Sequence, residues 1–306
     1  MRSSFLSCSN ELQDKFVIGD ANGVIYLYSY NNGECEKLSE FIVEGQNDEI
    51  YSLIQISNSC LVSSINESLF TWDFETQSMV SEINFKGLDD DIAYQFGGER
   101  NPSNTPFVFE SSFSSKSNLV FSALSDGSLR WCDMRSGEGI QVGCSPLVFG
   151  GEAPCTCVDV REETGEMVVG VGGGDGRLGL VDIRNSSSSS ILTTSSSHPH
   201  TRSVFGLKFM EGGDEMVSWG GDGKVSFSSI QSNVEIHLDL SISPFSQPFP
   251  IFDLSFCPST GQLAMVGGSS SNSTFLGVPI PILSLPSSVQ DDMRERNEEE
   301  EEEIKS

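Results

Sequence analysis

The chain has 306 residues, a formal net charge of −27 and only three histidines. A surface this acidic repels phosphate backbones, so we expect no direct nucleic-acid binding and favour basic partners such as histones or ribosomal proteins. Solubility alone is the other explanation of the charge. Eight cysteines in a chain of this length indicate free thiols. Without an apolar run of membrane length or a leader pattern, we expect no membrane span and an intracellular location, in the cytoplasm, the nucleus or the nucleolus.

Six segments along the chain share one pattern: an apolar strand, small residues, an Asn or Asp turn and a second strand with alternating apolar residues. They are Phe16–Glu34, Leu61–Gln77, Leu119–Glu138, Met167–Asn185, Met216–Gln231 and a weaker Leu263–Ile280. Their turn residues are Asn22, Asn66, Asp126, Asp175, Asp222 and Asn272, at steps of 44, 60, 49, 47 and 50 residues. A repeat period in the forties predicts the blades of a β-propeller.

Each turn joins two strands into a hairpin, because Asn-Gly and Asp-Gly are preferred in two-residue loops whose central residues both need positive φ. A further short apolar strand precedes most copies. Examples are Glu49–Ile56, Cys155–Val160, Ser203–Phe209 and Ile251–Phe256. An irregular fourth strand follows the hairpin. Together with the preceding strand and the two hairpin strands, it makes a four-stranded blade of each repeat.

The repeats resemble the WD-repeat (tryptophan–aspartate repeat) family of β-propellers, which mostly serve as interaction platforms. The residues that carry the likeness are Trp72 and Asp73, the pairs Asp126/Asp133 and Asp175/Asp182, and the segment from His200 to Phe209. In that family a His, a strand Ser, a turn Asp and a strand Trp form a hydrogen-bonded set. The resemblance assigns the first three places to His200, Ser218 and Asp222, while Ser228 stands in the Trp place.

We therefore predict an all-β fold with one propeller over residues 1–286, followed by a disordered acidic tail over 287–306. Seven blades are expected, of which six are visible. The long step suggests an extended loop over 87–113, and residues 185–197 form a Ser-rich loop around a short strand. Closure of the ring would use residues near Phe5–Cys8 and Phe275–Leu285.

Residues with catalytic or metal-binding chemistry are scarce. Cys155-Thr-Cys157 has a spacing too short for a zinc knuckle, and alternation would place both thiols on one face of a strand, in the core. The glycine-rich run Gly170–Gly176 lacks the third glycine and the following helix of a dinucleotide loop. We expect no enzyme activity, no metal and no cofactor.

Two neighbouring repeats end in Asp-x-Arg, at Asp133–Arg135 and Asp182–Arg184. This ending resembles that of WD-repeat substrate receptors of cullin–RING ubiquitin ligases, in which such arginines help contact the adaptor. The resemblance makes Arg135 and Arg184 candidate protein-binding residues. Pairing of each arginine with a nearby carboxylate is the structural alternative.

Two other residues are candidates for protein contacts. Trp219 occupies a place usually held by a small residue, so it is either a contact residue or a filler of the gap left by Ser228. Arg202 is a polar neighbour. The first repeat and the acidic tail also resemble nucleolar WD-repeat proteins of ribosomal RNA processing. The predicted function is a non-catalytic scaffold or adaptor, with a ubiquitin-ligase receptor and a ribosome-assembly factor as alternatives.

Overall fold

The computed structural model describes residues 5–7, 15–31, 34–42, 48–57, 59–85, 106–135, 140–145, 147–161, 168–183, 190–194, 198–210, 214–230, 236–243, 249–257 and 262–267. Over these ranges the strands form six antiparallel sheets, five with four strands and one with two. The predicted all-β propeller is confirmed.

Each sheet is one blade, and its strands follow the chain order. Blade 1 contains β1 (Phe5–Ser7), β2 (Lys15–Gly19), β3 (Val24–Asn31) and β4 (Glu34–Ile42); blade 2 contains β5 (Ile50–Gln55), β6 (Cys60–Ile65), β7 (Ser68–Asp73) and β8 (Ser78–Asn84). Blade 3 contains β9 (Val108–Ser114), β10 (Leu119–Leu124), β11 (Leu129–Asp133) and β12 (Ile140–Cys144); blade 4 contains β13 (Cys155–Arg161), β14 (Val168–Gly173), β15 (Leu178–Asp182) and β16 (Ser190–Thr194). Blade 5 contains β17 (Val204–Phe209), β18 (Glu215–Gly220), β19 (Val225–Ile230) and β20 (Ile236–Ile242); blade 6 contains β21 (Ile251–Cys257) and β22 (Gln262–Gly267).

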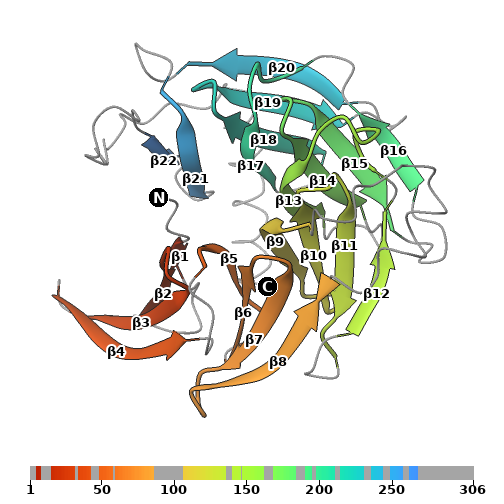
Figure 1. The fold of residues 1–306 in the computed structure, drawn as a ribbon. Coiled ribbons are helices and arrows are strands. Elements are labelled where there is room, and N and C mark those ends of the chain that lie inside the picture. The colour runs from red at the N-terminus through yellow and green to blue at the C-terminus, as the bar shows by residue number, and fades with distance from the viewer. Residues whose placement is uncertain are drawn as a thin grey trace, which may run out of the picture.

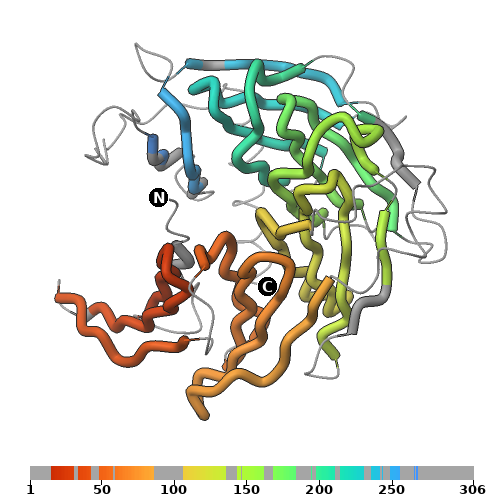
Figure 2. Tube along the Cα trace, in the orientation of Figure 1, coloured from red at the N-terminus to blue at the C-terminus, as the bar shows by residue number. Residues whose placement is uncertain are grey.

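The blades follow one another around a central axis in chain order (Figures 1 and 2). The first strand of each blade is innermost, and the first strands of successive blades contact one another. The axis is therefore lined by β1, β5, β9, β13, β17 and β21, and we call the space that they surround the central channel.

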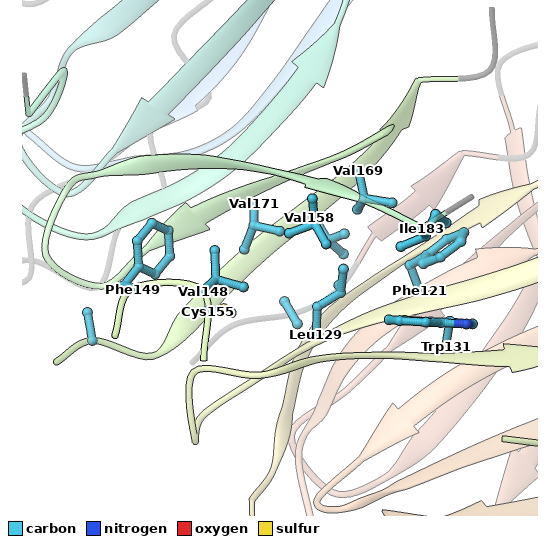
Figure 3. Close-up of a cluster of buried hydrophobic side chains, with 13 residues drawn as sticks. Phe121, Leu129, Trp131, Val148, Phe149, Cys155, Val158, Val169, Val171 and Ile183 are labelled. Atoms are coloured by element: carbon cyan, nitrogen blue, oxygen red, sulfur yellow. The ribbon is translucent and has the colours of Figure 1, made fainter. Parts of the chain in front are cut away.

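The apolar core lies between neighbouring blades because the two faces of each sheet pack against different partners. Cys132 faces blade 2, where it packs near Val62 and Leu69. The adjacent Trp131 faces blade 4, with Phe121 and Leu129 of its own sheet, as Figure 3 shows. Trp131 and Cys132 therefore lie on opposite faces of blade 3.

The hairpin turns of blades 1, 3, 4 and 5 differ from the predicted type. Gly127 adopts φ 83° and donates its N–H to Leu124 O at 3.1 Å, but Asp126 keeps negative φ. The Asp126 carboxylate instead accepts a hydrogen bond from the Ser128 N–H at 2.8 Å. These loops combine a type I turn with a glycine in the left-handed region. The other glycines with the same role are Gly23, Gly176 and Gly223.

The first strands of blades 2 to 6 carry β-bulges, which overturn one prediction. The bulge in β13 leaves Thr156 unpaired, with Cys155 opposite Gly173 and Cys157 opposite Gly172. The extra residue reverses the alternation. Cys155 therefore packs between blades 3 and 4, while Cys157 packs between blades 4 and 5. The two thiols do not share a face.

The strands of the structure fall within three segments for which boundaries were predicted. The loop predicted over 87–113 is wrong at its C-terminal end, because residues 108–113 belong to β9 and pair with β10. The Ser-rich loop contains β16, the predicted short strand. Strand β1 is the first strand of blade 1 and pairs with β2. The described ranges do not include residues 275–285 or the tail over 287–306. The predicted ring closure and the predicted seventh blade therefore stay predictions.

Candidate functional site

A buried polar network in blade 5 contains the three residues that the resemblance assigns, His200, Ser218 and Asp222. His200 is fully buried; its Nδ1 lies 3.0 Å from Asp222 Oδ1, and its Nε2 lies 2.9 Å from Ser218 Oγ. Burial raises the pKa of Asp222, but hydrogen bonds from His200 and from two backbone N–H groups outweigh it and leave the pKa below its usual value. The network ties the loop before β17 to the turn after β18, so its role is structural.

The Trp position of this network holds Trp72 in blade 2 and Ser228 in blade 5. In blade 2, Trp72 Nε1 donates to Ser63 Oγ at 2.9 Å. In blade 5, Ser228 lies diagonally across from Ser218 on the neighbouring strand, as Trp72 lies from Ser63 in blade 2. Its hydroxyl is buried and has no hydrogen-bond partner among the described residues.

Replacing Ser228 with alanine is therefore expected to leave the free energy of unfolding unchanged or to raise it by up to about 1 kcal/mol, because a buried hydroxyl without a partner is costly. Urea unfolding measures the change. Ser218→Ala is the matched control and is expected to lose about 1–2 kcal/mol, because Ser218 bonds His200. A comparable loss for Ser228→Ala would show that its hydroxyl does have a partner.

Trp219 is not placed as a surface contact residue. Its side chain is 3% exposed and packs with Val225, Ile251 and Leu254 between blades 5 and 6. A Cβ at Gly206 would lie 2.1 Å from the Trp219 ring, so the glycine leaves room for the indole. Alternation along β18 places Trp219 on the face opposite Ser218, so it does not fill the gap at Ser228 either.

Arg135 is both exposed and paired. Its side chain is 70% exposed, and its Nε lies 2.9 and 2.8 Å from the two carboxylate oxygens of Asp133. The hydrogen bond from Arg135 lowers the pKa of Asp133. Arg184 lies outside the described residues, although Asp182 ends β15 as predicted.

The remaining predicted residues lie at turns and strand ends. Asp73 ends β7 and accepts hydrogen bonds from the next turn, at 2.8 Å from both the Glu75 and Thr76 N–H groups. Asp175 accepts from Arg177 Nε at 2.6 Å in the turn of blade 4. Arg202 is exposed just before β17. The structure does not gather these residues into one site.

The inner strands contain a set of residues that sequence reasoning missed. Each bulge in these strands leaves one residue out of the ladder, at the same place in every blade. These residues are Tyr51, Phe109, Thr156, Phe205 and Phe252. Four of the five are aromatic and partly or well exposed, whereas Thr156 is buried. The signal was present in the sequence, because the second residue of each inner strand is aromatic in every blade from 2 to 6 except blade 4.

Ring contacts join these aromatic side chains across neighbouring blades. The Tyr51 ring centroid lies 5.7 Å from that of Phe107 and 6.3 Å from that of Phe109. Phe205 and Phe252 stack at 6.1 Å with an interplanar angle of 10°. These contacts join the first strands of neighbouring blades, which are the strands nearest the axis. We call Tyr51, Phe107, Phe109, Phe205 and Phe252 the channel aromatics.

Charged residues lie on four successive inner strands, and on β9 and β21 a carboxyl residue directly follows a channel aromatic. Glu110 follows Phe109 on β9 and accepts a hydrogen bond from the Val158 N–H at 3.1 Å. Asp159 on β13 accepts from the Phe209 N–H at 2.9 Å and pairs with Lys208 on β17 at 3.3 Å. On β21, Asp253 follows Phe252 and accepts from the Leu254 N–H at 2.8 Å.

The protonation of these groups reflects their partial burial. Burial raises the pKa of Glu110 to about 8, against the opposing effect of Lys208. Burial likewise raises the pKa of Asp253. The Asp159 carboxylate raises the pKa of Lys208. The site therefore combines aromatic faces with carboxyl groups, an arrangement suited to binding.

Within the described ranges, no group of three or more His, Cys, Asp or Glu side chains is arranged to hold a metal ion. The thiols of six cysteines are free, namely Cys35, Cys60, Cys132, Cys144, Cys155 and Cys157. No helix in the part of the chain covered by the structure is long and apolar enough to cross a membrane.

Comparison with solved structures supports the fold. The chain is similar to the crystal structure of the Cps50 (Swd1) β-propeller domain of Myceliophteria thermophila, with a TM-score of 0.62 and 13% sequence identity. The match covers 87% of this chain and 82% of that domain. No known family profile and no curated protein sequence matches the chain. At this identity the likeness establishes a β-propeller fold, which is used for many different functions.

Proposed function

We propose that this chain is a non-catalytic scaffold or adaptor that assembles a multiprotein complex through the loops and inner surface of its propeller, inside the cell. The observation that carries the proposal is the group of partly exposed aromatic side chains at the inner strands. Aromatic residues are enriched at the energetic centres of protein interfaces, and Phe252 is 38% exposed. The acidic charge of the chain supports basic proteins as partners.

Native affinity purification of the full chain followed by size-exclusion chromatography tests the proposal. We expect at least one protein to co-elute with the chain in a fixed stoichiometry. Recovery of the chain alone under gentle conditions, or catalytic turnover by the purified protein, would contradict a scaffold role.

A second candidate is a substrate receptor of a cullin–RING ubiquitin ligase, and the exposure of Arg135 supports it. The hydrogen bonds to Asp133 hold the exposed Arg135 guanidinium in one position, just after the end of β11. If this role is correct, a cullin-ligase adaptor co-purifies with the chain and is lost on Arg135→Ala. Absence of the adaptor from the wild-type complex rules the role out. The described residues add no observation in favour of a ribosome-assembly role.

A further inference from the structure

We propose that the side of blade 1 that points away from blade 2 binds a β-sheet element of a partner protein, one that presents aliphatic side chains at alternate strand positions. We call this side the open face, and its large apolar residues include Tyr26, Tyr28, Tyr30 and Ile42. The inference rests on the proposed scaffold function and adds a surface that lies outside the loops and the inner strands. Three features of blade 1 carry it.

The first feature is the contrast between the two sides of blade 1. Ile25 and Leu27 of β3 point toward blade 2, where they are buried together with Trp72. Side chains alternate along a strand, so the residues between and after them point the other way. Tyr26 and Tyr28 are only half-buried there, and Tyr30 is 50% exposed.

The outer strand of blade 1 extends the open face. Ile42 of β4 pairs with Val24 of β3, which places both side chains on the same side of the sheet as Tyr26. Ile42 is 53% exposed. A row of large apolar side chains that remains accessible on one sheet face is typical of a contact surface.

This exposure follows from the position of blade 1 in the series. Blades 1 and 6 are its two ends, and in Figure 1 no strand of the described ranges lies between them. The third strand of blade 2, by contrast, presents Phe70 and Trp72 toward blade 1, and these side chains are 0% and 3% exposed. The open face is therefore built like a contact between blades, but no described blade covers it.

The second feature is the concentration of tyrosine on the open face. The chain has five tyrosines, and three of them lie on β3, at alternate positions. Tyrosine is enriched in protein interfaces, because its ring buries apolar area while its hydroxyl stays hydrated. Phenylalanine is four times as common in the chain and occupies fully buried positions such as Phe70 and Phe121. The chain thus places tyrosine where a face meets water before a partner binds.

The third feature is the fixed arrangement of the rings. The Tyr28 ring stacks on Phe16, with 5.3 Å between the centroids and an interplanar angle of 10°. The Tyr26 hydroxyl donates to Asp20 Oδ2 at 3.3 Å, and Lys37 Nζ lies 4.6 Å from the centroid of the Tyr26 ring. Side chains that are already held in place lose little conformational entropy on binding.

The nature of the occupant follows from the contact between blades 1 and 2. There the aromatic Trp72 packs with the aliphatic Ile25 and Leu27 of the facing sheet. A partner continues this series on the open face when it brings aliphatic side chains at alternate positions of a strand.

The charges on the open face also favour an apolar occupant. Glu40 and Lys37 of β4 lie across from Tyr26 and Tyr28, so they share the open face. The Lys37 Nζ and the Glu40 Oε2 are 2.6 Å apart and neutralise each other. An apolar sheet face therefore fits this surface better than a strongly basic segment does.

Site-specific photocrosslinking tests the proposal. Benzoylphenylalanine replaces Tyr30 or Ile42 in the full chain or, as a control, Val80, which is 46% exposed on the outer strand of blade 2. The chain is irradiated in its native complex, and mass spectrometry identifies the cross-linked peptides. We expect positions 30 and 42 to cross-link to one protein, within a single strand or hairpin of alternating aliphatic residues. Position 80 should not cross-link to that protein.

The other outcomes separate this inference from the scaffold role. Cross-links from positions 30 and 42 to residues 268–306 of the same chain, or to a second copy, would overturn the proposal, as would equal cross-linking at position 80. If proteins co-purify in fixed stoichiometry but none cross-links at positions 30 and 42, the open-face inference fails while the scaffold role stands. Recovery of the chain alone contradicts both.

Charge placed on the open face gives a second readout. Tyr30→Asp and Ile42→Asp are each expected to lower the recovery of the cross-linked protein at least about tenfold, because binding would bury an unpaired charge. Both side chains are about half exposed, so the urea midpoint of unfolding should stay that of the wild type. Val80→Asp is the matched control and should retain the protein. Unchanged recovery with both open-face variants would contradict the proposal.

Discussion

Replacing Arg130 with methionine is expected to lower the free energy of unfolding by about 3–5 kcal/mol, the range for breaking a buried ion pair. Arg130 is 2% exposed on β11. Its Nη1 donates to Phe85 O at 2.8 Å, and its Nη2 lies 3.0 Å from Asp126 Oδ2. The guanidinium thus joins the turn of blade 3 to the end of blade 2. Methionine keeps much of the volume but leaves both acceptors without this donor. Thermal or urea unfolding measures the loss.

Arg135→Ala is the matched control for this prediction. Arg135 also pairs with an aspartate of blade 3, Asp133, but the Arg135 side chain is 70% exposed. Exposed pairs contribute little, so the expected change is below about 1 kcal/mol. The double variant Arg130→Met with Asp126→Asn should lose less than the sum of its parts, because the pair is removed together. A loss below about 1 kcal/mol for Arg130→Met would show that the buried pair does not stabilise the fold.

The fold could be predicted from the sequence because its strongest signals are local. The hairpin between the second and third strands of each blade is marked by one turn residue and by alternating apolar residues on both sides. The His200–Ser218–Asp222 network was also accessible, because the resemblance fixes the three positions and the structure shows their contacts.

What the sequence could not supply follows mainly from the bulges. Strict alternation placed Cys155 and Cys157 on one face, but a single unpaired residue between them puts them on opposite faces. The same irregularity brings Phe109 and Phe252 out of the ladder. A bulge depends on the register with the second strand, which is a property of the paired sheet and not of one strand's pattern.

Two functional candidates were chosen from the sequence on different grounds. Trp219 is a large residue at a place usually held by a small one, and Arg135 ends an Asp-x-Arg that resembles the ending of ubiquitin-ligase receptors. Exposure, however, is decided by the neighbouring blade, and Trp219 packs against blade 6. Arg130, the most buried cation described, was overlooked because nothing in its own strand indicates that Phe85 and Asp126 converge on it.

The free energy of unfolding is also expected to depend on pH through Glu110, and to fall as the pH rises. The ordinary pKa of 4.5 is raised to about 8 in the folded chain, chiefly by burial. Between these values the folded state keeps a proton that the unfolded state has lost. The stabilisation is therefore complete below about pH 4.5 and is lost as the pH rises through about 8, at a total cost on the order of 3–5 kcal/mol.

Glu110→Gln should remove this dependence, because glutamine stays neutral and its amide oxygen can still accept from the Val158 N–H. We expect the free energy of unfolding of the variant to match that of the wild type near pH 5 and to exceed it by about 3 kcal/mol or more above pH 8.

Asp222 supplies a control of opposite sign, because its pKa is lowered from 3.8 and its stabilisation is lost as the pH falls. Asp222→Asn should therefore flatten only the acid side of the curve. Parallel curves for the wild type and Glu110→Gln from pH 5 to 9 would show that Glu110 ionises in the folded chain as it does in the unfolded one.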